Sequence, residues 1–196
     1  MSDARAGWIE DDVARELPGL ALAWIDAAAP GGGSRSPAWL RARLRGLADR
    51  YAGARAVTMR REPVAAAYRA FSRHVGVDPD VDRPPVEAIV VERLMHGGFR
   101  SRGRVEDALL VGALGVRGAR AGERLGEGEL APDLPAGRLV VADTRRPVAV
   151  LLGDVADGDG PGPDTRRLRV FAIRVAGVPA VHVEEALWAS VEALRA

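Results

Sequence analysis

Apolar residues in this chain recur at helical spacing in the first part and in short strand-like runs in the second. Between Ala38 and Tyr51, leucines stand at positions 40, 44 and 47 and arginines fill the other faces, which is typical of a helix with one buried side. Glu62–Val75 follows the same pattern, with a proline suited to its first turn. The predicted helices of this part are Ala38–Tyr51, Glu62–Val75, Pro84–Met95 and Arg104–Leu114.

From Gly115 the chain breaks into short β-like runs separated by Gly, Pro and Asp. The clearest is LRVFAIRV at Leu168–Val175, rich in β-branched and aromatic residues, and a long polar loop, Asp154–Asp164, precedes it. An amphipathic helix, Val181–Ala196, closes the chain. The predicted strands are Leu20–Ala27 near the N-terminus and then Gly115–Ala119, Arg138–Ala142, Pro147–Leu152 and Leu168–Val175.

This order predicts an α+β fold in one domain spanning residues 1–196. A helix-rich part (1–114) would pack on a small β-barrel-like or folded sheet (115–177), and the C-terminal helix (180–196) would pack back on both. With 196 residues and 47% hydrophobic content, the chain can bury a substantial core.

Charge and composition narrow the chemistry. The chain has 28 basic and 27 acidic residues, a formal charge of +1, so bulk charge does not make it a polyanion binder. Every basic residue is Arg, and Lys, Asn and Gln are absent, so no side-chain amide can read a base; arginine can still bind phosphate or stack. No Cys is present, which excludes disulfides, thiolate nucleophiles and zinc–thiolate sites.

No cofactor, metal or membrane contact is expected from the motifs. The Gly-rich pieces match no phosphate-binding loop, and the three histidines, His74, His96 and His182, have no ligand spacing. The acidic, mixed N-terminus is unlike a secretory signal and no apolar run approaches the length of a membrane span, so we expect a cytoplasmic protein.

The stretch Ala67–Gly98 carries a family resemblance. An aromatic-basic start leads to the turn Gly76-Val77-Asp78-Pro79, then to Arg83-Pro84-Pro85 and a helix that begins at Val86. This order resembles the solo form of the B3/B4 domain, whose parent lies in the β subunit of bacterial phenylalanyl-tRNA synthetase and carries the editing site for mischarged tRNA. Similar segments extend the resemblance over most of Leu20–Gly177: Val116–Leu125, Gly137–Asp143, and the Asp164-Thr165 turn with the strand Arg167–Val175.

The resemblance implies a pocket beside the β-rich part that holds an aminoacyl group and hydrolyses the wrong ester. The residues that it places at this pocket are Glu123, Asp143, Asp157 and Thr165. Two features depart from the family pattern. Glu106-Asp107 is followed by no Asn, and Leu114 runs directly into Gly115, where the synthetase has a segment with a pocket histidine.

A basic and aromatic patch is the other candidate site. Phe99 stands among arginines near the Gly97-Gly98 turn, an arrangement that suits stacking on an unpaired base with phosphate contacts. The predicted RNA-binding residues are Arg69, Arg83, Phe99, Arg100, Arg102 and Arg104, with Arg93 nearby. The alternative is a solvated face, because five carboxylates stand close in sequence and could pair with these arginines: Asp78, Asp80, Asp82, Glu87 and Glu92.

Three functions therefore remain open. The first is an aminoacyl-tRNA deacylase that edits in trans as part of translation quality control. Because the ester is labile, positioning of the substrate and hydrogen bonds from backbone N–H groups to the oxyanion could suffice for hydrolysis. The second is a non-catalytic module that binds tRNA or other RNA. The third is a small-molecule-binding or protein-interaction domain that reuses the fold. No binding to DNA is expected, and the amino acid, the tRNA, the protein partners and the oligomeric state are left open by the sequence.

Overall fold

The computed structural model describes residues 4–28, 35–53, 58–115, 121–122, 139–144, 146–151, 161 and 164–195. Its described residues form six α-helices, one short 3₁₀ helix (η1) and six strands, in agreement with the predicted α+β class. The elements are β1 (Arg5–Ala6), α1 (Asp11–Glu16), β2 (Ala21–Ala28), α2 (Ala38–Arg50), η1 (Met59–Arg61), α4 (Pro63–His74), α5 (Pro85–His96), α6 (Arg104–Gly115), β3 (Ala121–Gly122), β4 (Val140–Ala142), β5 (Pro147–Val150), β6 (Arg167–Arg174) and α7 (Ala180–Arg195).

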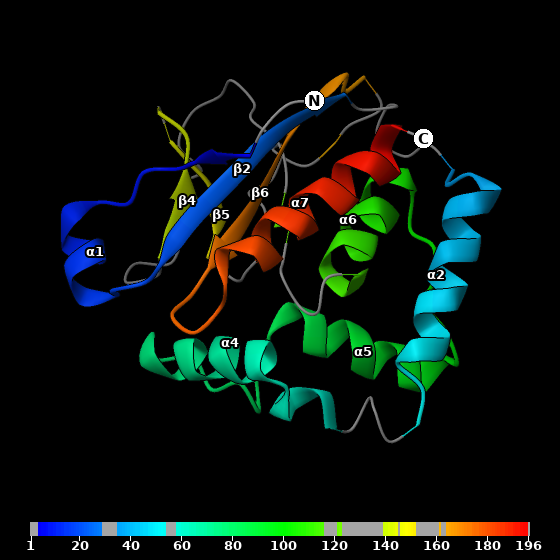
Figure 1. The fold of residues 1–196 in the computed structure, drawn as a ribbon, viewed down its shortest axis with the longest axis horizontal. Coiled ribbons are helices and arrows are strands. Elements are labelled where there is room, and N and C mark those ends of the chain that lie inside the picture. Colours follow the sequence, from blue (N-terminus) through cyan, green and yellow to red (C-terminus); the bar gives the residue numbers. More distant parts are fainter. Residues whose placement is uncertain are drawn as a thin grey trace.

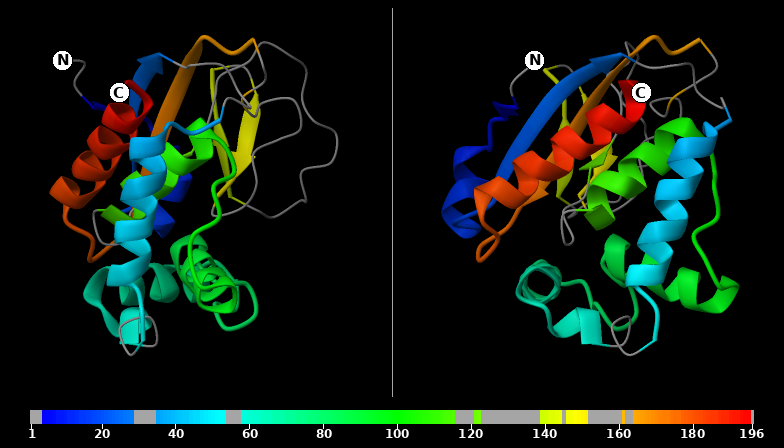
Figure 2. Two further views of the ribbon diagram at one scale, coloured as in Figure 1. Left: turned by 90° about the vertical axis from the view of Figure 1, so that its right-hand side faces the viewer. Right: turned by 45° about the vertical axis from the view of Figure 1, so that its right-hand side comes forward.

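Strands from opposite ends of the chain form the main sheet (Figure 1). Its order is β1-β2-β6-β3, and β2 pairs antiparallel with β6 over eight residues, from Ala21↔Arg174 to Ala28↔Arg167. A separate hairpin of β4 and β5 lies on one side of this sheet and α7 lies on the other (Figure 2, left). Within the described residues neither sheet closes into a barrel, so the barrel-like prediction is wrong there, and the strands form two separate antiparallel sheets.

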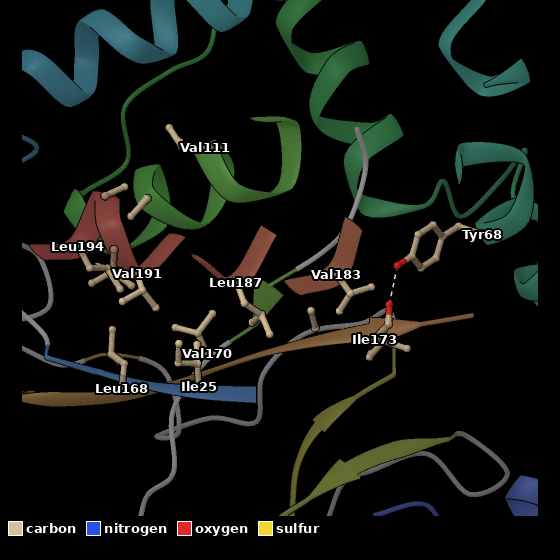
Figure 3. Close-up of a cluster of buried hydrophobic side chains, with 14 of the residues drawn as sticks. Ile25, Tyr68, Val111, Leu168, Val170, Ile173, Val183, Leu187, Val191 and Leu194 are labelled. Atoms are coloured by element: carbon tan, nitrogen blue, oxygen red, sulfur yellow. Dashed lines mark hydrogen bonds between the residues drawn. The ribbon is translucent and has the colours of Figure 1, made fainter. Parts of the chain in front are cut away.

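The hydrophobic core lies between the main sheet and α7. Successive residues of a strand point to opposite faces of the sheet, so alternate residues of β2 and β6 point toward α7. Ile25 of β2 stands opposite Val170 of β6, and both are fully buried beneath α7 (Figure 3). Each such buried side chain contributes about 1.5–3 kcal/mol to folding. The apolar side of α7 that covers them consists of Val183, Leu187, Val191 and Leu194, each at most 2% exposed.

Helices α6 and α7 approach closely at Gly112. A Cβ at this position would lie 2.5 Å from the carbonyl oxygen of Ala186 and nearer still to Ser190 Oγ. Ser190 is itself buried, and its hydroxyl donates to the Ala186 carbonyl at 2.9 Å. The small residue lets α6 pack on α7, and α6 then provides one wall of the groove described below.

The main sheet and the helix pair α4–α5 are joined by a buried tyrosine. Tyr68 of α4 donates its hydroxyl proton to the Ile173 carbonyl of β6 at 2.5 Å (Figure 3). Burial raises the pKa of Tyr68 well above its usual value, so the phenol stays protonated and can donate at neutral pH.

Helices α4 and α5 are held together by an ion pair. The guanidinium of Arg69, on α4, donates to both carboxylate oxygens of Glu87, on α5, at 2.9 and 3.1 Å. It also donates to Asp80 at 2.5 Å and to the Pro79 carbonyl at 3.2 Å. Arg69 and Glu87 are nearly buried, so the pair is shielded from water and fixes the position of α5.

Most predicted elements are confirmed within one or two residues, and four short ones were not predicted: β1, α1, η1 and β3. Gly115 ends α6 and does not begin a strand, so that predicted boundary is wrong. Residues 116–119 of the same prediction lie outside the described residues.

Candidate nucleic-acid interface

A groove of about 240 Å³ runs between α5 and α6. Its third wall is the connection between these helices, residues 97–103, which begins where Gly97 ends α5 in a left-handed conformation (φ 72°). The side chains that line it are those of Pro85, Val86, Ile89, Glu92, Arg93, Phe99, Arg100, Arg102, Glu106, Asp107, Leu109, Leu110 and Ala113.

The floor of the groove is apolar. Val86 and Ile89 of α5 stand one turn apart, while Leu109 and Leu110 come from α6. All four are only partly buried, as is Phe99, and all five pack against the hydrophobic core. The groove therefore offers apolar and aromatic surface to a ligand without unpacking the core.

Asp107 holds the connection between α5 and α6 in place through hydrogen bonds. Its carboxylate is 1% exposed and accepts hydrogen bonds from Ser36 Oγ (2.6 Å), Ser101 Oγ (2.6 Å) and the Arg102 backbone N–H (3.0 Å). The carboxylate also lies in the first turn of α6, where the helix dipole favours negative charge. These bonds fix the backbone on which Arg100 and Arg102 project, and they join it to the residue before α2.

Charges at the rim are of both signs. Arg102 donates to Glu92 at 2.7 and 2.9 Å, in a pair open to solvent that is worth little. Arg93 differs, because its Nε atom is buried and has no hydrogen-bond partner. Arg100 is exposed and forms no ion pair within the described part of the chain. The exposed guanidinium of Arg100 is therefore available to an acceptor on a ligand.

The structure brings three of the six predicted RNA-binding residues together at the groove: Phe99, Arg100 and Arg102. Arg83 is exposed in the loop before α5. Arg69 is committed to the ion pair with Glu87, and Arg104 donates to the Leu194 carbonyl at 3.1 Å, which ties α6 to the end of α7. Arg69 and Arg102 thus bind Glu87 and Glu92, as the charge-pairing alternative expected, whereas Arg104 binds a backbone carbonyl.

The predicted editing residues are described only in part. Asp143 accepts a hydrogen bond from the Arg146 N–H at 2.8 Å and its own N–H donates to the Arg146 carbonyl at 2.9 Å, so it closes the β4–β5 turn. Thr165 is half-buried just before β6. Glu123 and Asp157 lie outside the described residues, and a shared pocket for the four stays a prediction.

A second cavity, of about 280 Å³, lies between α1, β2 and β4. Its lining is apolar except for Glu10, and it includes Leu22, Ile173 and all three residues of β4, which lead directly into Asp143. Trp8 stands at this cavity with more than half of its surface exposed.

One histidine, His96, has an ordinary structural contact. His96 Nδ1 lies 2.9 Å from the Glu92 carbonyl oxygen, one turn back in α5, which matches the helix-end interpretation of this residue. Among the described residues no three His, Asp or Glu side chains could hold a metal ion together.

Sequence reasoning missed Asp107 and Ser36 as site residues. A carboxylate in the first turn of a predicted helix after Ser-Arg-Gly indicates capping, but its second partner, Ser36, is 71 residues away. No family model, curated protein or solved structure matches this chain. In the described residues, no helix combines the length and apolarity required to cross a membrane.

Proposed function

We propose that this protein is a free-standing B3/B4-type protein that binds tRNA, with the α5–α6 groove receiving an unpaired nucleotide. One observation supports this above all. Phe99, Arg100 and Arg102, which the sequence singles out as an aromatic-basic run, line one groove.

The chemistry of the groove suits an unpaired nucleotide. An aromatic ring stacks on any base, and such stacking contributes about 1–3 kcal/mol per base. Arg100, whose side chain is exposed, can bind the adjoining phosphate. Because no Asn or Gln exists in the chain, recognition of the base edge depends on arginine and on backbone groups.

The size of the groove limits the ligand to about one nucleotide. Its 240 Å³ is smaller than the roughly 300–1,000 Å³ of pockets that hold drug-sized molecules. The rim carries three arginines and three carboxylates, so stacking must contribute more than net charge at this position.

The direct test is fluorescence anisotropy with a labelled single-stranded RNA that ends in CCA, the common 3′ end of tRNA. The Phe99→Ala, Arg100→Ala variant should bind about tenfold more weakly or worse, since it loses one stacked base and one phosphate contact. The matched control is Phe171→Ala, Arg167→Ala on β6, which changes the same residue types away from the groove.

Equal affinity of the groove variant and the wild-type protein would refute the proposal, and so would an equal loss in the control. Thermal unfolding of each variant is measured first, so that a loss of binding is compared only between folded proteins.

Hydrolytic editing in trans is a second candidate, supported by the apolar cavity beside β4. This cavity could take the side chain of an amino acid esterified to tRNA, and its lining residue Ala142 directly precedes Asp143, one of the residues that the B3/B4 resemblance places at the pocket. Val140 lines it and is 39% exposed, so Val140→Trp should fill the cavity at little cost in stability.

The corresponding assay follows ester loss from correctly and incorrectly charged tRNAs. Editing predicts hydrolysis of one mischarged species, lost in Val140→Trp and kept in Val181→Trp, a change at another exposed valine, on α7. Absence of hydrolysis by the wild-type protein would leave RNA binding without catalysis.

A further inference from the structure

Helix α2 carries four arginines that the protein itself does not use: Arg41, Arg43, Arg45 and Arg50. All four are exposed, and none forms an ion pair or hydrogen bond within the described part of the chain. Asp49 is the one acidic residue of the helix. Some arginines elsewhere differ, since Arg102 and Arg169 each bind a nearby carboxylate. The positive charge of α2 therefore faces solvent uncompensated.

The arginines stand on both flanks of α2. The helix buries Leu40, Leu44 and Leu47, each at most 2% exposed. At about 100° per residue, Arg41 and Arg45 fall on one side of this buried face, and Arg43 and Arg50 fall on the other. The crest that points away from the protein then carries Ala42 and Gly46, two of the smallest side chains, and near its C-terminal end the carboxylate of Asp49. A low crest between two rows of arginine lets a polyanion approach the helix backbone closely.

Gly46 keeps the crest of α2 low. Glycine inside a helix costs about 1 kcal/mol relative to alanine. A Cβ at Gly46 would meet no atom within 4 Å, so packing inside the protein does not require glycine there. At Gly112, in contrast, close packing on α7 does. The glycine of α2 lies in open space on the crest between the arginines.

Helix α2 lies beside the connection that carries Phe99, Arg100 and Arg102, which runs up along it in both further views (Figure 2). The two are joined chemically, because Ser36, just before α2, and Ser101 of the connection both donate to Asp107. A ligand that enters the α5–α6 groove can thus continue onto α2.

We propose that α2 is a second RNA-contact surface, one that binds the sugar-phosphate backbone of a double-stranded A-form segment next to the unpaired nucleotide. This inference rests on the proposed function. A shallow, wide minor groove is the side of an RNA duplex that proteins reach, and arginines on both flanks of a narrow helix suit the phosphates on its two edges. An anionic membrane fits less well, because insertion requires an exposed apolar helix face and α2 buries its leucines in the core.

The test compares two RNAs that share one sequence. The first is the single strand ending in CCA, and the second is a hairpin that carries the same strand as its 3′ overhang. The wild-type protein should bind the hairpin about tenfold more tightly, with a steeper salt dependence. Arg41→Ala, Arg43→Ala, Arg45→Ala should abolish this advantage and reduce the salt slope by about 2 to 3, while affinity for the single strand stays unchanged. A matched triple variant, Arg15→Ala, Arg167→Ala, Arg195→Ala, removes the same charge from other exposed positions and should keep the advantage.

The Gly46→Leu variant tests whether a loss of RNA binding can occur without a loss of stability. Leucine is a better helix former than glycine, so this variant should unfold at a higher temperature and yet lose the hairpin advantage, because its side chain raises the crest. Retention of the full advantage in both the α2 triple variant and Gly46→Leu would overturn the inference.

The outcomes distinguish the two proposals. Single-strand binding that depends on Phe99, with no gain for the hairpin, overturns the α2 surface and keeps the proposed function. Binding of neither RNA overturns both. Binding to phosphatidylserine vesicles that is tighter than to the hairpin and is lost in the α2 triple variant also overturns the inference, since the partner would then be a lipid surface.

Discussion

Helices α2 and α4 both carry arginines at helical spacing, and the structure uses them in opposite ways. Arg69 of α4 is nearly buried and binds Glu87, Asp80 and the Pro79 carbonyl. The arginines of α2 are exposed and have no carboxylate within reach in the described part of the chain. The role of each arginine in this protein therefore depends on whether the fold places a carboxylate beside it.

The largest expected effect is at the buried arginine. Arg69→Ala leaves Glu87 buried without its partner and should lower the free energy of unfolding by about 3 kcal/mol. Chemical denaturation followed by circular dichroism measures it. Arg43→Ala on α2 should change the same quantity by less than about 0.5 kcal/mol. Arg69→Met combined with Glu87→Leu should cost less than Arg69→Ala alone, because no charge stays buried; a larger cost would contradict this explanation.

A smaller effect is expected at Asp107, which connects the two surfaces. Asp107→Ala removes the acceptor of Ser36, Ser101 and the Arg102 N–H and should cost about 2 kcal/mol of stability. Because the connection loses its anchor, binding of the CCA strand should weaken as well. Glu106→Ala, at the adjacent and exposed carboxylate, is the control. Unchanged RNA affinity in a folded Asp107→Ala protein would mean that the connection does not position the groove residues.

The smallest expected effect is on the stability of the protein at low pH. The hydrogen bond from Arg69 lowers the pKa of the exposed Asp80 carboxyl, with smaller contributions from nearby arginine charges. A carboxyl with a lowered folded-state pKa stabilises the fold above its unfolded pKa, about 3.9, and this stabilisation is lost as pH falls through the folded value. Asp80→Asn should therefore show less loss of stability below about pH 4 than the wild-type protein. Parallel pH curves for the two proteins would show that Arg69 does not shift Asp80.

The sequence predicted the longer elements because their patterns run for several turns or residue pairs. Leu40, Leu44 and Leu47 mark α2, and LRVFAIRV marks β6. Helix α1, with six residues, and β1, with two, are too short to display a period. The pairing of β2 with β6 joins residues about 140 positions apart, a distance over which hydrophobic spacing carries no information.

Only the part of the candidate site that is formed by residues close in sequence could be predicted. Phe99, Arg100 and Arg102 stand within four residues, so their shared groove could be anticipated. The bonds of Arg104 to Leu194 and of Asp107 to Ser36 cross 90 and 71 positions, and tertiary packing alone creates them. Arg69 was ambiguous because its partners, Asp80 and Glu87, are close in sequence and could equally have pointed to solvent.

Ultraviolet cross-linking of unmodified tRNA to the wild-type protein, followed by mass spectrometry of the linked peptides, tests the central claim most directly. RNA binding by the groove and α2 predicts linked nucleotides at Phe99 and on the peptides of residues 35–53 and 97–103. It also predicts none at Trp24, which lies between Arg5 and Arg169 on the main sheet. Cross-links confined to the sheet, or an absence of cross-links, would contradict the account.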